Sequence, residues 1–319
     1  MKATKNATCG SLLALACLLS PTVLAANLYV SPGGASSGCA AKTPCASIQT
    51  AVNTAKPGDT IHIAAGDYVE NVTIPVEKTK LHLRGAGENA TRVISAGGDA
   101  VPKAAPPGVA IDVVFDIFAS DVTLEQLSIE HPAGVPTKRD LGVSVRPPAA
   151  HVTIQKTTIS RNRTGSNLEP TNPGSRGVFV LQAKGTVIAK NTFKGNYEDH
   201  IHIPSSESTI EKNQVNDATR IGIVIIQEST TSVSDKNLIS GNMVKNSGSD
   251  GIQIQGDGNT ISKNTVSHSG GAGIRLCGAG DCVAPGASAV ANDNKVIKNN
   301  LNSNSAGDVV DHGAGNTIQ

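Results

Sequence analysis

The sequence predicts an all-β parallel β-helix, a solenoid in which coils of short strands stack on one another. Two observations lead to this prediction: a recurring phrase built around Asn, and a second phrase of alternating apolar residues. In the first phrase, two positions separate an aliphatic residue from Asn, and one position separates Asn from an apolar residue. This Asn stands at positions 191, 213, 242, 264 and 299, which gives spacings of 22, 29, 22 and 35 residues. A unit this short cannot bury its own apolar face, so the units have to stack.

The second phrase is a strand signal. Its four residues alternate with period 2, are rich in Ile and Val, and usually begin with Gly. It occurs at 177–180, 200–203, 222–225, 251–254 and 273–276. Strands that repeat in one direction stack about 4.8 Å apart. We therefore expect each recurring Asn at a turn, where its side chain bonds the Asn of the next coil and its backbone tolerates the left-handed region.

A short helix is predicted ahead of the first strand. The segment 47–55 places its apolar residues on one helical face, with Ser47 as the N-cap. The run Pro-Gly-Asp-Thr at 57–60 ends this helix and leads into a strand at 60–63. Such a helix would cover the open end of the solenoid.

The opening of the chain resembles the right-handed parallel β-helix proteins of the pectin-lyase-like superfamily. The resemblance rests on Tyr-Val-Ser at 29–31, the helix, and the turn at 57–60, and it extends over 27–319. It implies a single-stranded right-handed parallel β-helix with a short N-terminal capping helix. The superfamily includes lyases, hydrolases, epimerases and non-enzymatic surface proteins, so the resemblance leaves the activity open.

Residues 1–25 are predicted to be a signal peptide and 26–319 to form the β-helix domain. Two lysines precede an apolar run at 12–19, and small residues precede a cleavage site after Ala25. The apolar run is too short to span a membrane. A secreted or periplasmic protein is expected, and a lipoprotein cleavage before Cys17 is the weaker alternative.

Four cysteines remain after removal of the signal peptide. They form two close pairs, Cys39 with Cys45 and Cys277 with Cys282. An even number of closely paired cysteines in an exported chain predicts two short-loop disulfides. Their spacing fits no strong zinc pattern.

The net charge and the aromatic content limit the classes of binding partner that the sequence predicts. The formal net charge of +1 falls to −1 when the two signal-peptide lysines are subtracted, so no nucleic-acid or membrane-surface signature is present. The chain has no Trp, three Tyr and four Phe, whereas neutral sugars are usually held on aromatic faces. The expected partner is therefore an acidic polysaccharide. No cofactor is required by the sequence, and calcium is the alternative to holding such a polymer by Arg or Lys alone.

Alternation also predicts which residues leave the core. In the phrase Gly-Ile-x-Ile the aliphatic residues face inward, so the Gly and x positions are expected to face outward. The x positions then form one outward column: Ser144, Phe179, His202, Val224, Gln253 and Arg275. The positions before Gly form a column beside it: Arg176, Asp199, Ile221, Asp250 and Ala272.

One coil departs most from the repeat, at 197–202. His200 replaces the usual Gly, and His200 and His202 are both expected to point outward. The chemistry that the superfamily resemblance implies is proton abstraction beside a uronate carboxylate, followed by β-elimination or C5 epimerisation. It needs a base, a partner for the carboxylate and an acid. We assign His202 or His200 as the base and Tyr197 as the acid.

Charged residues of the two columns fill the other roles. Arg176 or Arg275 would pair with the substrate carboxylate, and Asp199 would orient a histidine or join a calcium site. Asp250 and Gln253 are further substrate-binding candidates. No metal-ligand set is predicted, because the His-x-His pair lacks a third ligand.

Two other functions fit the same pattern. An exposed Asp-His-x-His is also typical of a solvated polar face, as on a non-catalytic surface or adhesion β-helix. An inverting glycoside hydrolase would use Asp199 and Asp250, whose backbones lie two coils or about 9.6 Å apart. Ile221 lies between them, and its aliphatic side chain offers no hydrogen bond to an attacking water.

The C-terminal end is predicted to be open. The segment 315–319 repeats the start of the unit at 258–262, and the coil at 307–310 would present unpaired backbone groups. Self-association through this end, or a frayed last coil, is expected.

Overall fold

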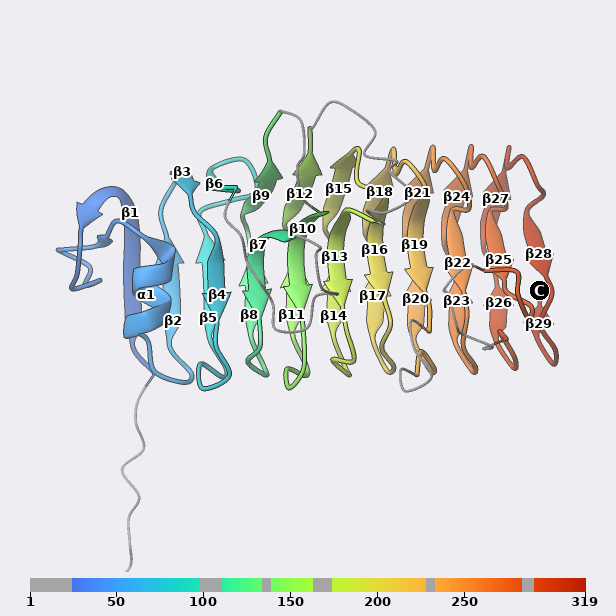
Figure 1. Ribbon diagram of the computed structural model, residues 1–319, viewed down its shortest axis with the longest axis horizontal. Coiled ribbons are helices and arrows are strands. Elements are labelled where there is room, and N and C mark those ends of the chain that lie inside the picture. The colour runs from blue at the N-terminus through green and yellow to red at the C-terminus, as the bar shows by residue number, and fades with distance from the viewer. Residues whose placement is uncertain (1–24, 98–110, 134–138, 163–173, 228–232, 283–289) are drawn as a thin grey trace, which may run out of the picture.

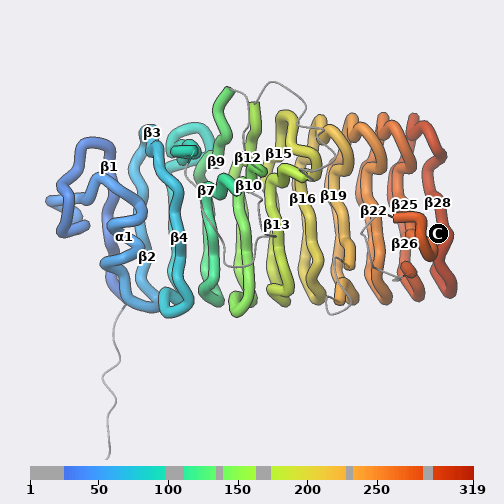
Figure 2. Tube along the Cα trace, viewed as in Figure 1, coloured from blue at the N-terminus to red at the C-terminus, as the bar shows by residue number. Residues whose placement is uncertain are grey.

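The computed structural model describes residues 25–97, 111–133, 139–162, 174–227, 233–282 and 290–319. These residues form one continuous parallel β-helix, and Figure 1 shows its coils side by side along one axis. The path of the chain in Figure 2 makes each coil visible as one turn of the solenoid. The predicted all-β solenoid is confirmed, whereas the predicted signal peptide lies almost entirely outside the described residues.

Three parallel sheets make the walls of the solenoid, and each complete coil runs from sheet A to sheet C to sheet B. Sheet A contains β1 (Asn27–Ala35), β2 (Thr60–Ile63), β5 (His82–Gly85), β8 (Thr123–Glu125), β11 (Thr153–Gln155), β14 (Val187–Ala189), β17 (Thr209–Glu211), β20 (Leu238–Ser240), β23 (Thr260–Ser262), β26 (Lys295–Ile297) and β29 (Thr317–Ile318). Sheet B contains β4 (Val72–Ile74), β7 (Ile111–Ile117), β10 (Arg139–Val145), β13 (Arg176–Val180), β16 (Asp199–Ile203), β19 (Ile221–Ile225), β22 (Ile252–Ile254), β25 (Ile274–Leu276) and β28 (Val309–Asp311). Sheet C contains β3 (Gly66–Val69), β6 (Thr91–Ile94), β9 (Ser128–His131), β12 (Thr158–Arg161), β15 (Thr192–Gly195), β18 (Gln214–Asn216), β21 (Met243–Lys245), β24 (Thr265–Ser267) and β27 (Asn300–Asn302). The inward aliphatic residues of all three sheets form one core along the axis.

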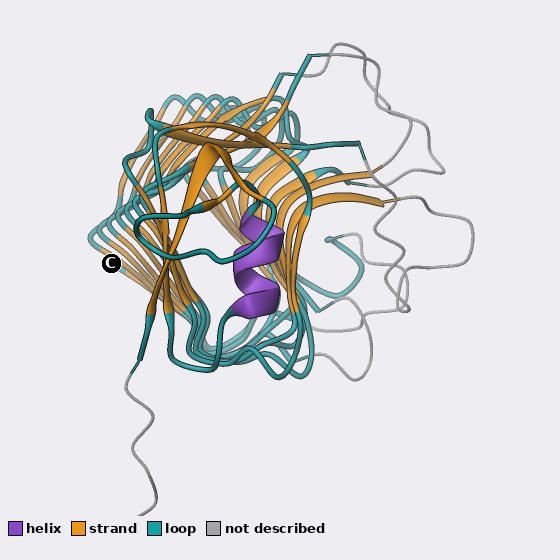
Figure 3. Cartoon of the chain, turned by 90° about the vertical axis from the view of Figure 1, so that its left-hand side faces the viewer, coloured by secondary structure: helices purple, strands orange, loops and turns teal. Residues whose placement is uncertain are grey.

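The helix α1 (Ile48–Thr54) lies at the N-terminal end of the solenoid, where Figure 3 shows it across the first coil. Ser47 caps it as predicted, since its hydroxyl accepts a hydrogen bond from Thr50 N. Glu70 adds a second cap that the sequence did not predict. Its carboxylate accepts hydrogen bonds from the backbone N–H groups of Ile48 and Gln49 at 2.8 and 3.0 Å. A carboxylate is stabilised at a helix N-terminus by the orphan N–H groups there.

The predicted asparagine ladder is confirmed. The side-chain amide of Asn213 donates to Asn242 Oδ1 at 2.9 Å and to the carbonyl of Ile188 at 2.8 Å. In turn, Asn213 Oδ1 accepts from the backbone and side-chain N–H groups of Asn191 at 2.9 and 3.1 Å. The same bonds continue from Asn242 to Asn264. Each Asn therefore joins its own coil to the coils on both sides.

The left-handed backbone, however, belongs to the residue before each Asn, so the prediction of its position was wrong. Lys190, Lys212, Lys263 and Lys298 have φ between 54 and 58°. The Asn side chain has to enter the turn to reach the next coil, and the residue ahead of it absorbs the sharp change of direction.

A second asparagine ladder was not predicted. It runs along the start of the sheet A strands and contains Asn237, Asn259, Asn294 and Asn316. The backbone N–H of each of the first three donates to Oδ1 of the next asparagine in this order, at 2.7 to 2.8 Å. Its sequence signal is an Asn two residues before the inward aliphatic residue of a sheet A strand.

Both predicted disulfides, Cys39–Cys45 and Cys277–Cys282, are present. Among the described residues, no helix has the length and apolar character needed to cross a bilayer. At the C-terminal end, Leu301 and Val309 are only partly buried against the core. Self-association through this end stays a prediction.

We expect Asn213→Ala to lower the free energy of unfolding by about 2–4 kcal/mol, because the buried N–H of Asn191 and carbonyl of Ile188 lose their partner. Denaturant unfolding followed by circular dichroism would measure this change. Asn300→Ala is the matched control, since Asn300 lies exposed on the outside of the same solenoid. An equal, small effect of both substitutions would contradict the role of the ladder.

Candidate functional site

The outer face of sheet B carries the two predicted columns of side chains. Strand register places Phe179, His202, Val224, Gln253 and Arg275 in one row across neighbouring coils. The row beside it contains Arg176, Asp199 and Ile221. Both rows lie outside the main core, as predicted.

The Gly positions face inward, so the prediction that they face outward was wrong. A Cβ on Gly251 would lie 2.2 Å from Val266 Cγ1, which belongs to the core. The reason is a break in the alternation. The consecutive N–H groups of Gly251 and Ile252 both donate to the next coil, to the carbonyls of Ala272 and Gly273, at 2.9 Å each. Two neighbouring residues then face inward at the same place in each coil, and the first of them has room for little beyond glycine.

His200 occupies this inward Gly position and does not point outward. Its ring lies 5.8 Å from that of Phe193 and 5.9 Å from that of Tyr197, and it is fully buried. Nε2–H donates to the carbonyl of Asn216 at 2.8 Å. Burial lowers the pKa of His200 to about 4, so its ring is neutral at neutral pH.

Tyr197 also lies inside the solenoid. It is fully buried in the main core, and its Oη lies 2.9 Å from His131 Nδ1. Of the four residues assigned catalytic roles from the sequence, only Asp199 and His202 thus share the outer face of sheet B. The expected outward direction of His200 was wrong because strict alternation was assumed through this break, and Tyr197 lies before β16 in the turn that leads from sheet C into sheet B.

The Asp199 cluster consists of Asp199, His202, Arg220, Glu198 and Arg176. Asp199 Oδ2 lies 2.9 Å from His202 Nδ1 and also accepts a hydrogen bond from Arg220 Nη2. Arg220 comes from the next coil, and its Nε lies 2.9 Å from Glu198 Oε1. Arg176 lies over the ring of Phe179 at 4.6 Å.

This arrangement fixes the charge and the tautomer of the cluster. Burial alone would raise the pKa of Asp199, but the hydrogen bond from His202 and the positive charge led by Arg220 hold it below its ordinary value. An ionised Asp199 accepts a hydrogen bond from Nδ1–H of His202, which makes Nε2 the acceptor atom of the neutral ring. An imidazole held in this way has the orientation of a general base.

Solvent reaches this cluster at Arg220, since Arg176 is buried. Asp199 and His202 are 0 and 2% exposed, whereas the side chain of Arg220 is 35% exposed. One coil further, Ile221, Val224 and Ile226 form a small buried apolar cluster. Contact with a dissolved ligand would therefore begin at the arginine.

The remaining predicted residues lie beyond that apolar cluster. Asp250 is buried and accepts two hydrogen bonds from Arg275, at 2.7 and 3.1 Å, and Gln253 lies in the row between His202 and Arg275. Asp199 and Asp250 are thus separate carboxylates, each paired with its own arginine. Arg220 and Glu198 were not predicted as site residues. Glu198 directly precedes Asp199 in the sequence, and Arg220 directly precedes Ile221. Their contact can be predicted only when the register that pairs Asp199 with Ile221 is known.

A second buried polar cluster was also not predicted. Asp112, His131 and Asp140 meet where the chain passes from sheet C to sheet B, and their donor atoms lie within 4.8 Å of one another. His131 Nε2 is 3.7 Å from Asp112 Oδ2 and 3.9 Å from Asp140 Oδ1. One imidazole and two carboxylates are donor types that suit a transition-metal ion.

Calcium does not fit this set, because it takes oxygen ligands. The carboxylates also have protein donors. Ser95 Oγ donates to Asp112 at 2.5 Å and Arg161 Nε to Asp140 at 2.7 Å. Each of the three side chains is thus held by its own hydrogen-bond partner, Ser95, Arg161 or Tyr197, at a corner of the solenoid.

Comparison with known proteins supports the fold. The family described as Right handed beta helix region matches residues 114–244. The alginate lyase from Paenibacillus sp. strain FPU-7 superposes with a TM-score of 0.54 and 14% identity, over 91% of this chain and 99% of the lyase. A sequence search found no significant match among curated proteins.

Two further solved structures have the same fold and different activities. The A-module of an Azotobacter vinelandii mannuronan C-5 epimerase gives a TM-score of 0.52 and 13% identity, over 86% of this chain and 75% of that one. A pectin methylesterase from Erwinia chrysanthemi gives 0.53 and 11%, over 89 and 92%. At these identities the similarity establishes a right-handed parallel β-helix and leaves the chemistry to the site.

We expect the free energy of unfolding to fall as the pH drops from about 6.5 to about 4. In this range the unfolded chain binds a proton at residue 200 that the folded chain excludes, because the folded pKa is the lower one. The stabilisation is complete above pH 6.5, and its loss amounts to about 3.5 kcal/mol at most, from about 1.4 kcal/mol per pH unit over this range. Urea unfolding at several pH values would measure it.

His200→Gln should flatten this pH dependence, since glutamine keeps an N–H donor and does not titrate. His268→Asn is the control, because His268 is exposed and its φ of 59° suits Asn. A steep dependence that persists in His200→Gln would assign the effect to other groups.

Proposed function

We propose that this right-handed parallel β-helix protein acts on an acidic, uronate-containing polysaccharide by β-elimination or C5 epimerisation. The observation that supports this proposal is the contact of His202 Nδ1 with an ionised, arginine-bound Asp199 on the outer face of sheet B. Similar folds occur in proteins whose names include alginate lyase and mannuronan C-5 epimerase.

In the proposed reaction, His202 Nε2 takes the proton from C5 of a uronate. Asp199 keeps Nδ1–H in place and stabilises the imidazolium that forms. Arg220 or Arg275, the more exposed cations of this face, pairs with the substrate carboxylate and withdraws charge as C5 loses its proton.

The two outcomes differ in where the electrons and the proton go. In elimination, the electron pair of the C5–H bond forms a C4–C5 double bond, the bond from C4 to its glycosidic oxygen breaks, and that oxygen takes a proton. In epimerisation, C5 regains a proton on the opposite face of the ring. His202 is a base in both, and the imidazolium is a proton source for the departing oxygen in the first.

Burial favours a second candidate, a non-catalytic β-helix used for adhesion or surface structure. A base must touch its substrate, and His202 is 2% exposed. The catalytic proposal therefore includes a rearrangement that uncovers His202 when the substrate binds. An inverting hydrolase has the least support, because it needs a protonated acid. Asp199 has a lowered pKa, and Asp250 is paired with Arg275.

We further propose that the protein is secreted or periplasmic, which its signal-peptide pattern and two disulfides support. A calcium ion bound at Asp199 together with the substrate is a further hypothesis. One oxygen of Asp199 is occupied by His202 and Arg220, so any such ion would depend on substrate carboxylates for its other ligands.

We expect the purified protein to release unsaturated uronate, seen as new ultraviolet absorbance, from alginate, pectate or a glycosaminoglycan. His202→Ala should lower this rate by a factor of about 10² or more, the usual contribution of a general base. The assay is run with calcium and with a chelator, and exchange of the C5 proton detects an epimerase that forms no double bond.

His268→Asn again serves as the control, and a thermal melt of each variant verifies folding. Full activity in His202→Ala would remove this site from consideration. Absence of both absorbance and exchange on all three polymers would favour the non-catalytic function.

A further inference from the structure

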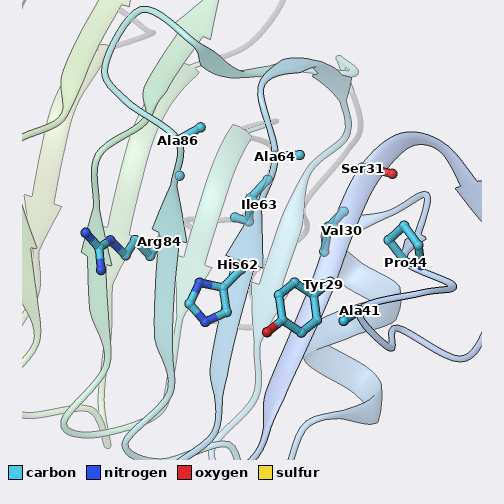
Figure 4. A pocket seen from close by; sticks show the side chains of 11 residues that line it. Tyr29, Val30, Ser31, Ala41, Pro44, His62, Ile63, Ala64, Arg84 and Ala86 are labelled. Carbon is cyan, nitrogen blue, oxygen red and sulfur yellow. The ribbon is translucent and has the colours of Figure 1, made fainter.

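A hollow of about 420 Å³ lies on the outer face of sheet A, near the N-terminal end of the solenoid. Figure 4 shows the side chains that line it, on β1, β2 and β5 and on the loop that contains Ala41 and Pro44. It lies on a different sheet from the Asp199 cluster. Its residues have no part in the proposed reaction.

Two neighbouring rows of side chains create the hollow. Tyr29, His62 and Arg84 stand in one row, in register across the first three strands of sheet A. Two residues further along each strand, the outward positions are the small residues Ser31, Ala64 and Ala86. A row of long side chains beside a row of short ones leaves a shelf, which Pro44 limits at one end. The shelf spans three coils, about 10 Å from the first to the third.

The wall of the hollow carries fixed polar groups. The rings of Tyr29 and His62 stack at 5.2 Å with an angle of 19° between their planes. His62 Nε2 lies 2.9 Å from Asn27 Oδ1 and donates to it, which makes Nδ1 an acceptor. Burial, with the nearby positive charge of Arg84, lowers the pKa of His62, so the ring is neutral at neutral pH. The Tyr29 hydroxyl and the Ser31 hydroxyl are further donors and acceptors.

Arg84 gives the hollow a cation that is prepared for an anion. Its Nε donates to Gln126 Oε1 at 2.7 Å and lies 3.6 Å from Glu125 Oε1, which holds the side chain in place. Within the described part of the chain, its two Nη groups have no protein partner, and its side chain is 51% exposed. Glu125 also faces His82 at 2.9 Å, so its charge is shared. A planar guanidinium with two outward N–H groups suits a carboxylate.

We propose that this hollow is a saccharide-binding site that holds one or two sugar rings carrying a carboxylate. The alanine methyl groups of the floor suit the apolar face of a sugar ring, Arg84 binds the carboxylate, and the wall bonds the hydroxyl groups. The volume is at the lower end of the range for small-molecule sites and suits a disaccharide. The choice of a uronate over another small carboxylate rests on the proposed function.

The chain offers its own optical probe for this site. It has no Trp and three Tyr. Tyr68 and Tyr197 are 3 and 0% exposed, while Tyr29 is partly exposed on the wall of the hollow. Tyrosine emission therefore reports on Tyr29 when a ligand enters, and calorimetry of the same solution gives the affinity.

The test titrates the full chain with digalacturonate and dimannuronate, and with their neutral counterparts galactobiose and mannobiose. We expect saturable binding of at least one acidic disaccharide with a change of tyrosine emission, and binding of its neutral counterpart about tenfold weaker. Arg84→Gln should reduce the acidic affinity by about tenfold, which corresponds to about 1.4 kcal/mol. Ala64→Leu, which fills the floor, should abolish binding of both sugars.

Matched controls are Lys295→Gln, which removes a cation from the outer face of sheet A far from the hollow, and Ala306→Leu, which enlarges an exposed alanine elsewhere. Neither should change the affinity. No saturable binding up to about 10 mM, equal affinity for the neutral sugars, or unchanged binding in Ala64→Leu would each overturn the proposal.

The outcome is separable from that of the proposed function. His202→Ala should bind the disaccharides at the hollow as the wild type does, whatever happens to its activity. A protein that degrades polymer without binding at the hollow would refute the inference about the hollow alone. Binding without any reaction would refute the lyase or epimerase alone.

Discussion

Side-chain hydrogen bonds between equivalent asparagines hold the coils in register from Thr157 to the C-terminal end. Asn191, Asn213, Asn242 and Asn264 are buried, and each bonds the coil before it and the coil after it. An inserted loop can lengthen a coil, as between Asn213 and Asn242, and the ladder bond still forms at 2.9 Å. Because the register is fixed at the turns, the rows of side chains on the sheets follow from it. The Asp199 cluster depends on such rows, whereas the hollow lies on the first coils, ahead of the first ladder asparagine.

The break in the alternation of sheet B decides which side chains of that sheet reach the surface. Two consecutive residues face inward at this point, so the strand presents Asp199 and His202 outward with His200 and Ile201 between them facing the core. The carboxylate and the imidazole are three residues apart and still meet at 2.9 Å. A strand with strict alternation would place residues three apart on opposite faces. The local irregularity thus creates the contact on which the proposed chemistry rests.

The fold could be predicted from the sequence because its signals are local and repeated. A recurring Asn, a four-residue alternation and an N-cap at Ser47 each describe their own segment. The site could be predicted only in part. Strand alternation identified His202, and Asp199 was chosen from the position before the usual glycine. His200 was assigned to the wrong side, since the break in the alternation has no signal beyond the glycine that usually occupies it. Arg220 lies in the next coil, so its contact with Asp199 is a property of stacking that no single unit encodes.

The inward position of His200 has a consequence for how the solenoid comes apart. Each coil contacts only its neighbours, so stability is a sum over coils and the interfaces between them. A proton on His200 weakens one coil and its two interfaces, in the interior of the stack and far from either end. Acid would therefore divide the molecule into two blocks, each still internally folded and each with three newly exposed strand edges. Such edges pair readily with those of other chains. We therefore expect low pH to favour association of molecules that have opened at this coil.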